Sequence, residues 1–103
     1  MLAGPLCART LLDLGAELIK IEPLRPDVSR FAFPSTPGVS GYYPQQSAGK
    51  LNVSIDLNTP DARALALRPG DSADVVVENF RAGTLGFFGL DYETSAARNP
   101  RLI

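Results

Sequence analysis

The sequence predicts an α/β fold in which the strands of a parallel sheet are joined by crossover helices. A helical run in "GPLCARTLLDLGAELIKIEP" feeds an alternating strand pattern through a glycine, as in half of a βαβ unit. A second alternating run, "KLNVSIDL", precedes another helical pattern. The three consecutive valines of "ADVVVENF" indicate a short strand buried on both faces, which is typical of a parallel sheet covered by helices.

The first helix is expected from the leucines that recur at helical spacing, with Pro5 in its first turn and Gly15 at its end. A strand over Leu18 to Ile21 follows. The chain starts at the entrance of this helix, without the strand that a complete βαβ unit places before it. The N-terminus is therefore expected to cut through regular structure.

Residues 23–49 are rich in proline, glycine and serine and show no periodicity, which predicts a long loop. A strand over Leu51 to Leu57 comes next. The following helix is predicted to have Thr59 as its N-cap and Pro60 in its first turn. It should stop near Arg68, because the Pro-Gly pair after that residue cannot continue a helix.

Beyond the valine run, "GTLGFFGL" predicts a short helix or turn, and "YETSAARNP" predicts a helix capped by Asp91 and closed by Asn99-Pro100. The final "RLI" has the pattern of another strand beginning. The chain is expected to form one incomplete domain, residues 1–103, whose sheet is truncated at both ends.

Composition excludes several classes of function. Acidic and basic residues nearly balance, 11 against 10, and no basic run is present, so a nucleic-acid partner is not expected. There is no histidine, which rules out histidine triads and histidine metal sites within these residues, and a single cysteine allows no internal disulfide. No apolar stretch approaches the roughly 20 residues of a membrane span, and no signal peptide is recognised, so we expect no membrane partner and a cytoplasmic location. The GxGxxG and P-loop motifs are absent.

The polar end of the valine run is the main candidate site. Ligands of open parallel sheets gather at the carboxyl ends of the strands, where Glu78, Asn79, Phe80 and Arg81 would lie. The alternative is an ordinary loop, in which Asn79 satisfies turn backbone and Phe80 folds into the core. Four cations in loops or near strand ends could likewise bracket phosphates or be scattered surface charges, namely Arg25, Arg30, Lys50 and Arg81. The "AGP" turn at Ala3 could face an anion or simply begin a helix.

Taken in order, "LAGPLCARTLLDLGAELIKIEP", "GKLNVSIDLNTPDAR", "ADVVVENFRAGTLGFFGLDYE" and "NPRLI" resemble the class III CoA-transferases. That family (CaiB/BaiF type) includes formyl-CoA transferase, carnitine CoA-transferase and α-methylacyl-CoA racemase. The resemblance covers nearly the whole chain apart from the proline-rich loop. It implies part of a Rossmann-like large domain, from proteins whose full-length protomers interlock as a homodimer.

The resemblance also implies coenzyme A or acyl-CoA as a substrate rather than a covalently bound cofactor, with a carboxylic acid as acceptor. The family's CoA contacts from the "ENF" segment carry over to Asn79 and Phe80, and those near the end of "NVSIDL" carry over to Ile55. The "AGP" turn at Ala3 would approach the thioester end of CoA. Pro23 replaces a basic residue common after "KIE", which makes Arg25 the nearest substitute for a nucleotide contact, and Arg81 is a further candidate cation.

Full members of the family are several times longer, and none of the aspartates here aligns with the family's aspartate nucleophile, which forms an aspartyl-CoA thioester. No catalytic residue and no metal ligand is therefore assigned, and the chain alone is expected to be inactive. A racemase-type member of the same family and a non-catalytic CoA-binding or interaction remnant stay open as alternatives. An unrelated α/β nucleotide-binding domain is disfavoured by the missing glycine fingerprint.

Overall fold

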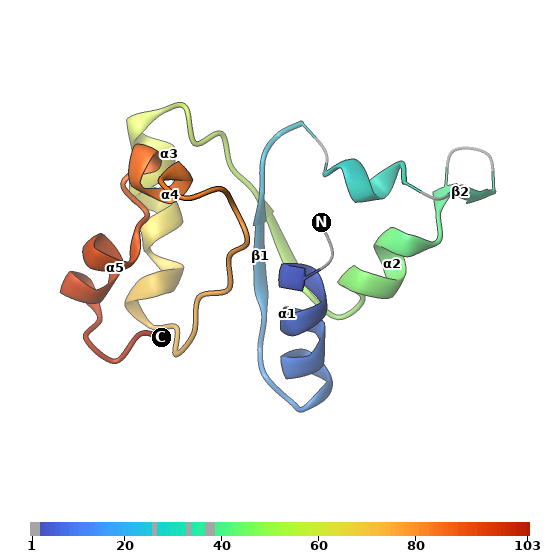
Figure 1. The fold of residues 1–103 in the computed structure, drawn as a ribbon, viewed down its shortest axis with the longest axis horizontal. Coiled ribbons are helices and arrows are strands. Elements are labelled where there is room, and N and C mark those ends of the chain that lie inside the picture. The colour runs from blue at the N-terminus through green and yellow to red at the C-terminus, as the bar shows by residue number, and fades with distance from the viewer. Residues whose placement is uncertain (1–2, 26, 33, 37–38) are drawn as a thin grey trace. The chain divides into compact units, whose positions relative to one another are not determined.

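The computed structural model describes residues 3–25, 27–32, 34–36 and 39–103 (Figure 1). The chain divides into two units, Met1–Ser54 and Ile55–Ile103, and each is described by itself. Within the described ranges, no helix is long and apolar enough to cross a membrane.

Unit 1 contains the predicted helix and the predicted parallel strands. Helix α1 spans Ala3–Asp13, and strands β1 (Ile19–Glu22) and β4 (Leu51–Ser54) pair in parallel (Figure 1). The backbone N–H of Gly15 donates to the carbonyl of Leu12 at 2.9 Å, just beyond the end of α1. The helix, the glycine turn and the strand therefore follow in the predicted order.

The two faces of the β1–β4 pair differ in polarity, because side chains alternate between the faces along each strand. The register pairs Ile19 with Leu51, Lys20 with Asn52, Ile21 with Val53 and Glu22 with Ser54. The apolar pairs share one face and are exposed, whereas Glu22 on the other face is buried. Every buried residue described in unit 1 is polar, namely Glu22, Ser29, Ser40 and Gln46.

Residues 23–49 differ from the long loop that the sequence predicts. They contain the 3₁₀ helix η1 (Val28–Arg30), strands β2 (Pro34–Thr36) and β3 (Val39–Ser40), which pair antiparallel, and helix α2 (Tyr42–Ser47). Helix α2 contacts both α1 and η1. Elements this short carry too few residues for a hydrophobic period, so periodicity could not reveal them.

Unit 2 is mainly helical, with α3 (Pro60–Leu67), η2 (Pro69–Asp71), α4 (Thr84–Phe88) and α5 (Tyr92–Arg98) (Figure 1). The N-caps agree with the prediction. The side chain of Thr59 accepts a hydrogen bond from the Ala62 N–H at 3.4 Å, and that of Asp91 accepts one from the Thr94 N–H at 2.8 Å. Helices α3 and α5 both contact η2.

The valine run does not form a strand, contrary to the prediction. Residues 75–80 lie outside any helix or strand, and all three valines are exposed. The segment nevertheless makes two backbone hydrogen bonds of the kind found between parallel strands. Val76 N–H donates to the Ile103 carbonyl at 2.8 Å, and Ile103 N–H donates to the Asp74 carbonyl at 3.1 Å. A segment forms a strand only when several of its residues hydrogen-bond to a neighbouring strand. Here, among the described residues, Ile103 alone pairs with the valine segment.

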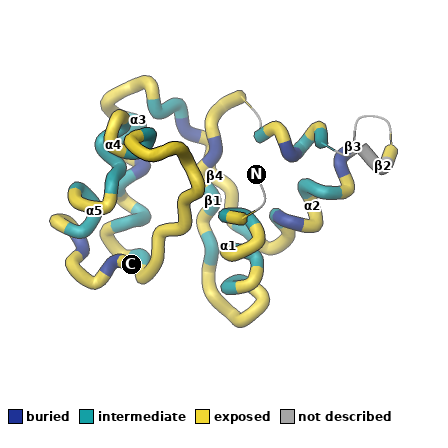
Figure 2. Tube along the Cα trace, viewed as in Figure 1, coloured by how far each residue is buried: buried dark blue, intermediate teal, exposed yellow. Residues whose placement is uncertain are grey.

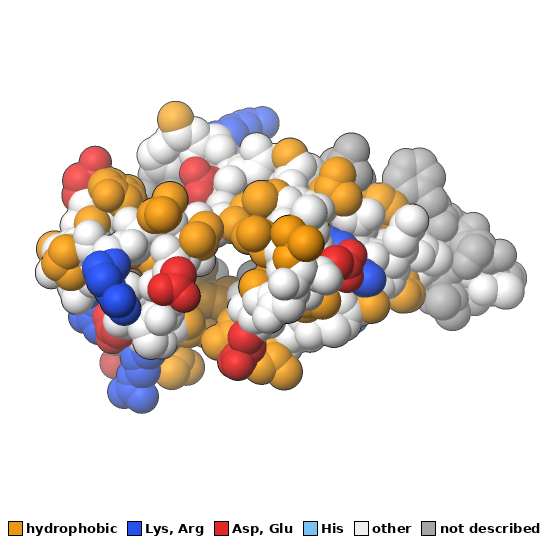
Figure 3. Space-filling view, turned by 90° about the horizontal axis from the view of Figure 1, so that it is seen from below, with side chains coloured by type: hydrophobic (Ala, Val, Ile, Leu, Met, Phe, Trp, Pro, Cys, Tyr) orange, Lys and Arg blue, Asp and Glu red, His pale blue; other side chains and the backbone are white. Residues whose placement is uncertain are grey.

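The apolar core among the described residues is small. Ile55, Ala66 and Leu102 are the buried apolar residues, and all belong to unit 2. Figure 2 shows exposed positions predominating along the chain. Hydrophobic side chains are correspondingly frequent on the face in Figure 3, where acidic and basic side chains are interspersed. Among the described residues, the face shown there has no large patch of purely positive or purely negative side chains.

Candidate functional site

The segment after the valine run presents its side chains to solvent. The carboxylate of Glu78 accepts a hydrogen bond from the Phe80 N–H at 2.7 Å. Asn79 is exposed and makes no hydrogen bond within the described residues, and Phe80 is 64% exposed. Glu78 rather than Asn79 therefore satisfies the backbone in this segment, and Phe80 is not part of the core.

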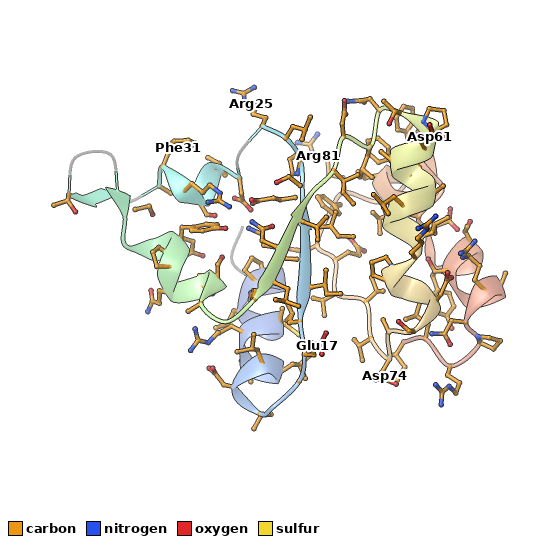
Figure 4. The ribbon with its side chains drawn as sticks, turned by 180° about the vertical axis from the view of Figure 1, so that it is seen from behind. Glu17, Arg25, Phe31, Asp61, Asp74 and Arg81 are labelled. Carbon is orange, nitrogen blue, oxygen red and sulfur yellow. The ribbon has the colours of Figure 1, made fainter. Side chains whose placement is uncertain are left out.

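Arg81 follows directly and lines a groove of about 470 Å³ in unit 2. Its carbonyl accepts from the Thr84 N–H at 3.0 Å at the entrance of α4, but its guanidinium has no hydrogen-bond or ion-pair partner in the described part of the chain. The remaining lining is partly apolar, from Val76, Leu85 and Leu102, and partly acidic. Arg81 is labelled in Figure 4.

Three carboxylates also line this groove, those of Glu78, Asp91 and Glu93. The backbone hydrogen bond from Thr94 holds the pKa of Asp91 below its ordinary value, so this side chain is ionised as a helix cap. With Arg81 as the cation among these lining residues, the groove does not by itself favour a polyanion. An anion would be recognised at Arg81 itself rather than throughout the groove.

Ile55 follows β4 directly and is 5% exposed. Its side chain lies in the apolar core of unit 2, so any contact with a ligand would come from its backbone. The aliphatic side chain at this position serves packing, which explains why the alternating pattern of "NVSIDL" extends to it.

Unit 1 holds the other two predicted site residues. Ala3 begins α1 and is exposed. Arg25 lies in the loop that follows β1, is exposed, and has no hydrogen-bond or ion-pair partner within the described ranges. Figure 4 shows its side chain at the tip of this loop, pointing away from the strand.

Lys50 lies beside the "AGP" turn, because its ammonium donates to the Pro5 carbonyl at 2.8 Å. Burial, followed by the neighbouring charges of Lys20 and Arg9, lowers the pKa of Lys50 below its ordinary value. Lys50, one of the candidate cations, thus lies at the first turn of α1, a contact with a residue 45 positions away that no local pattern predicts.

The sequence also did not reveal a cluster of charges around Glu22, which is 5% exposed. Its carboxylate accepts hydrogen bonds from Lys20 at 3.1 Å, from Asn52 at 2.6 Å and from Arg30. Burial alone would raise the pKa of Glu22, but the hydrogen bonds from Arg30, Asn52 and Lys20 outweigh it and lower the pKa below its ordinary value. The alternation of "IKIE" places Lys20 and Glu22 on one face of the strand. It could not have identified Arg30 and Asn52, which are distant in the sequence, as partners of Glu22.

The six predicted site residues do not form one described site. Asn79, Phe80 and Arg81 are consecutive and belong to unit 2 together with Ile55, whereas Ala3 and Arg25 belong to unit 1. No group of three or more metal-ligating side chains occurs among the residues that the structure describes. What the arrangement offers chemically is exposed guanidinium, amide and aromatic groups, which suit a ligand with phosphates and an aromatic base.

Comparison with known proteins identifies one family. The model of CoA-transferase family III matches residues 1–103. The chain is 42% identical to succinyl-CoA–D-citramalate CoA-transferase of Chloroflexus aurantiacus, over 99% of this chain and 26% of that protein. It is 40% identical to succinate–glutarate CoA-transferase of Agrobacterium fabrum, over 100% of this chain and 28% of that protein.

A solved structure shares the fold as well. The crystal structure of a CAIB/BAIF family protein from Brucella suis matches with a TM-score of 0.89 and 40% sequence identity, over 98% of this chain and 28% of that one. This likeness confirms the predicted α/β, Rossmann-like fold class. The chain spans about a quarter of the length of the curated relatives it matches.

Proposed function

The chain belongs to CoA-transferase family III, and from this premise we propose that it forms the coenzyme-A-binding portion of an enzyme that moves CoA between carboxylic acids. The family match across residues 1–103 carries the proposal. In such a transfer the carbonyl–sulfur bond of the donor thioester breaks and one forms on the acceptor. An oxygen of the acceptor carboxylate ends on the donor acyl group, so both acids are accounted for and no further reactant is consumed.

The exposed segment Asn79–Arg81 is proposed to contact CoA. Its side chains are exposed, and the Phe80 N–H is already satisfied by Glu78. An exposed aromatic ring can stack on the adenine base, and a guanidinium pairs with phosphate oxygens in two parallel hydrogen bonds. Arg25 offers the same phosphate chemistry from unit 1, while Ala3 and the backbone of Ile55 would contribute short-range contacts.

The nucleophile is proposed to lie outside residues 1–103, so that this chain alone does not transfer CoA. Four of its aspartates already have partners: Asp13 pairs with Arg9, Asp27 with Lys20, and Asp71 with Arg98, while Asp91 caps α5. An aspartyl-CoA thioester would form on a residue elsewhere in the complete enzyme. We further propose that the complete enzyme is an interlocked homodimer in the cytoplasm.

The activity is tested with the full gene product, incubated with succinyl-CoA and a panel of carboxylic acids. Mass spectrometry should detect a new acyl-CoA and free succinate in equal amounts. Hydroxylamine should trap an aspartyl thioester as a hydroxamate on the protein. If no acid accepts CoA, yet the α-proton of a 2-methylacyl-CoA exchanges with D₂O, the protein is a racemase and the proposed transfer is wrong.

The proposed contact surface is tested with a matched pair of variants. Phe80 and Phe87 are both highly exposed, at 64% and 74%, but only Phe80 lies in the proposed contact segment. Phe80→Ala should weaken CoA binding roughly tenfold, about 1.4 kcal/mol, as expected for loss of one stacked base. Phe87→Ala should leave the Kd unchanged. Equal effects of the two substitutions would contradict the assignment of Phe80.

A further inference from the structure

The loop after β1 is held at both of its ends by charged side chains. At its start, the carboxylate of Glu22 binds Arg30, which lies in η1 at the far side of the loop. Near its end, Asp27 accepts a hydrogen bond from the Ser29 N–H at 2.8 Å and lies 3.5 Å from the ammonium of Lys20. Lys20 also donates to Glu22, so one lysine joins the two carboxylates.

The ring of Tyr43 holds the two cations in place. The guanidinium carbon of Arg30 lies 4.0 Å from the ring centroid and the ammonium of Lys20 lies 4.8 Å from it. Both distances are within the range of cation–π attraction. The Asn52 amide completes the cluster, donating to Glu22 at 2.6 Å and to the Tyr43 hydroxyl at 3.4 Å. Each cation therefore has at least two partners, which restricts its rotamers.

The charges of the cluster balance, and the neighbouring cation Arg25 lies outside it. Glu22 and Asp27 carry two negative charges, and Lys20 and Arg30 carry two positive charges, so these four residues are neutral together. Arg25, between the two held ends of the loop, is exposed and unpaired within the described residues. The loop therefore presents the Arg25 guanidinium between two anchored positions, Glu22 and Asp27.

We propose that Glu22 is a positioning residue for phosphate binding at Arg25. By holding Arg30 directly, and Asp27 through Lys20, it restrains the described residues that flank Arg25 and so presents the Arg25 guanidinium. Because the residues around Arg25 are already restrained, less backbone conformational entropy is lost when Arg25 binds phosphate than on an unrestrained loop. The inference rests on the proposed function, and the ligand group is a phosphate of CoA, either the 3′-phosphate or the pyrophosphate.

The test is a double-mutant cycle on the full gene product, with CoA binding measured by calorimetry. Arg25→Gln should raise the Kd for CoA about tenfold. Glu22→Gln, which keeps the size of the side chain but removes its charge, should raise the Kd about fivefold when Arg25 is present. In the Arg25→Gln background, Glu22→Gln should cause no further loss. Turnover should follow the same pattern, with a raised KM for acyl-CoA and an unchanged kcat.

A matched control removes an exposed carboxylate from the same unit. Glu17 precedes β1, whereas Arg25 follows it, and the two lie toward opposite ends of the strand in Figure 4. Glu17 has no partner within the described part of the chain, so Glu17→Gln should leave the Kd unchanged. Asp27→Asn is a milder second variant if Glu22→Gln does not fold. It keeps an N-cap for Ser29, loses the charge opposite Lys20, and should show the same coupling to Arg25.

The outcomes separate this inference from the proposed function. If the wild-type protein binds CoA but Arg25→Gln binds it equally well, the positioning role is wrong and the function stands. Equal losses from Glu22→Gln with and without Arg25 would show that Glu22 acts on general stability, which also overturns the inference. If wild type does not bind CoA, both fall. Repeating the cycle with 3′-dephospho-CoA identifies the phosphate: loss of the Arg25 effect assigns the 3′-phosphate, and its persistence assigns the pyrophosphate.

Discussion

Replacing Asn99 by alanine is expected to destabilise unit 2 by about 3 kcal/mol. Asn99 is 7% exposed and its side-chain amide donates to the Gly70 carbonyl at 3.0 Å and to the Ala73 carbonyl at 2.8 Å. Its side-chain oxygen accepts from the Arg101 N–H at 3.2 Å. One side chain thus ties the end of α5 to η2 and to the start of the valine segment.

The magnitude follows from these three hydrogen bonds. Each contributes about 1 kcal/mol net, and alanine would leave two carbonyls and one N–H without their partner. A loss of about 3 kcal/mol raises the equilibrium constant for local opening on the order of a hundredfold. The effect should concentrate where Asn99 holds the chain, at the bonds that join Val76 and Ile103.

Native-state hydrogen exchange on the full gene product measures this opening directly. The amides of Val76 and Ile103 should exchange on the order of a hundredfold faster in Asn99→Ala than in wild type. Asn58→Ala is the matched control, because Asn58 is exposed and its side chain, among the described residues, donates to the nearby Asp56 carboxylate at 2.8 Å. If both variants change the exchange of these amides equally, the argument from the buried hydrogen bonds is refuted.

Three further predictions follow from unit 1 and its surface. Because the folded-state pKa of Glu22 is lowered, its stabilising effect is complete above the ordinary carboxylate pKa of about 4.3 and is lost as pH falls through the folded value. The stability difference between wild type and Glu22→Gln should therefore shrink in acid, and a difference independent of pH would contradict the ion cluster. Gly49→Ala should destabilise more than Gly83→Ala in urea unfolding. Both positions have φ near +80°, where an alanine costs about 1 kcal/mol more than a glycine. Of the two, Gly49 is the position where an added Cβ would meet a neighbour, Leu12, at 3.0 Å. Equal losses of unfolding free energy in the two variants would disprove this clash. The isolated 103-residue chain should bind ANS and self-associate through the exposed apolar face of β1–β4, and a sharp monomeric melting transition would show otherwise.

Local rules predicted the elements whose signals lie within a few residues. Thr59 and Asp91 cap their helices because a side-chain oxygen reaches an N–H three residues on, and that reach depends only on local geometry. The glycine turn between α1 and β1 is local in the same sense. These features survive in any tertiary context that permits the helix.

The candidate site was predicted less completely. The polar end of the valine run was predicted to be a ligand site and stays a prediction; the structure places Arg81 on a groove. The valines themselves were expected to be buried, and they are exposed, because burial depends on neighbouring layers rather than on β-branched side chains. Ile55 was chosen as a contact residue, yet its side chain is packed in the core.

The sequence by itself determined the helix–glycine–strand order of α1 and β1, the helix caps of α3 and α5, the parallel α/β class and the family, because alternation, caps and motif spacing are written in neighbouring residues. Only the tertiary structure decided the surroundings of Glu22. Its partners Arg30 and Asn52 lie 8 and 30 residues away, and they meet because β1 pairs with β4 and η1 folds back beside them. Hydrogen bonds between distant residues depend on the path of the whole chain, which no local pattern encodes.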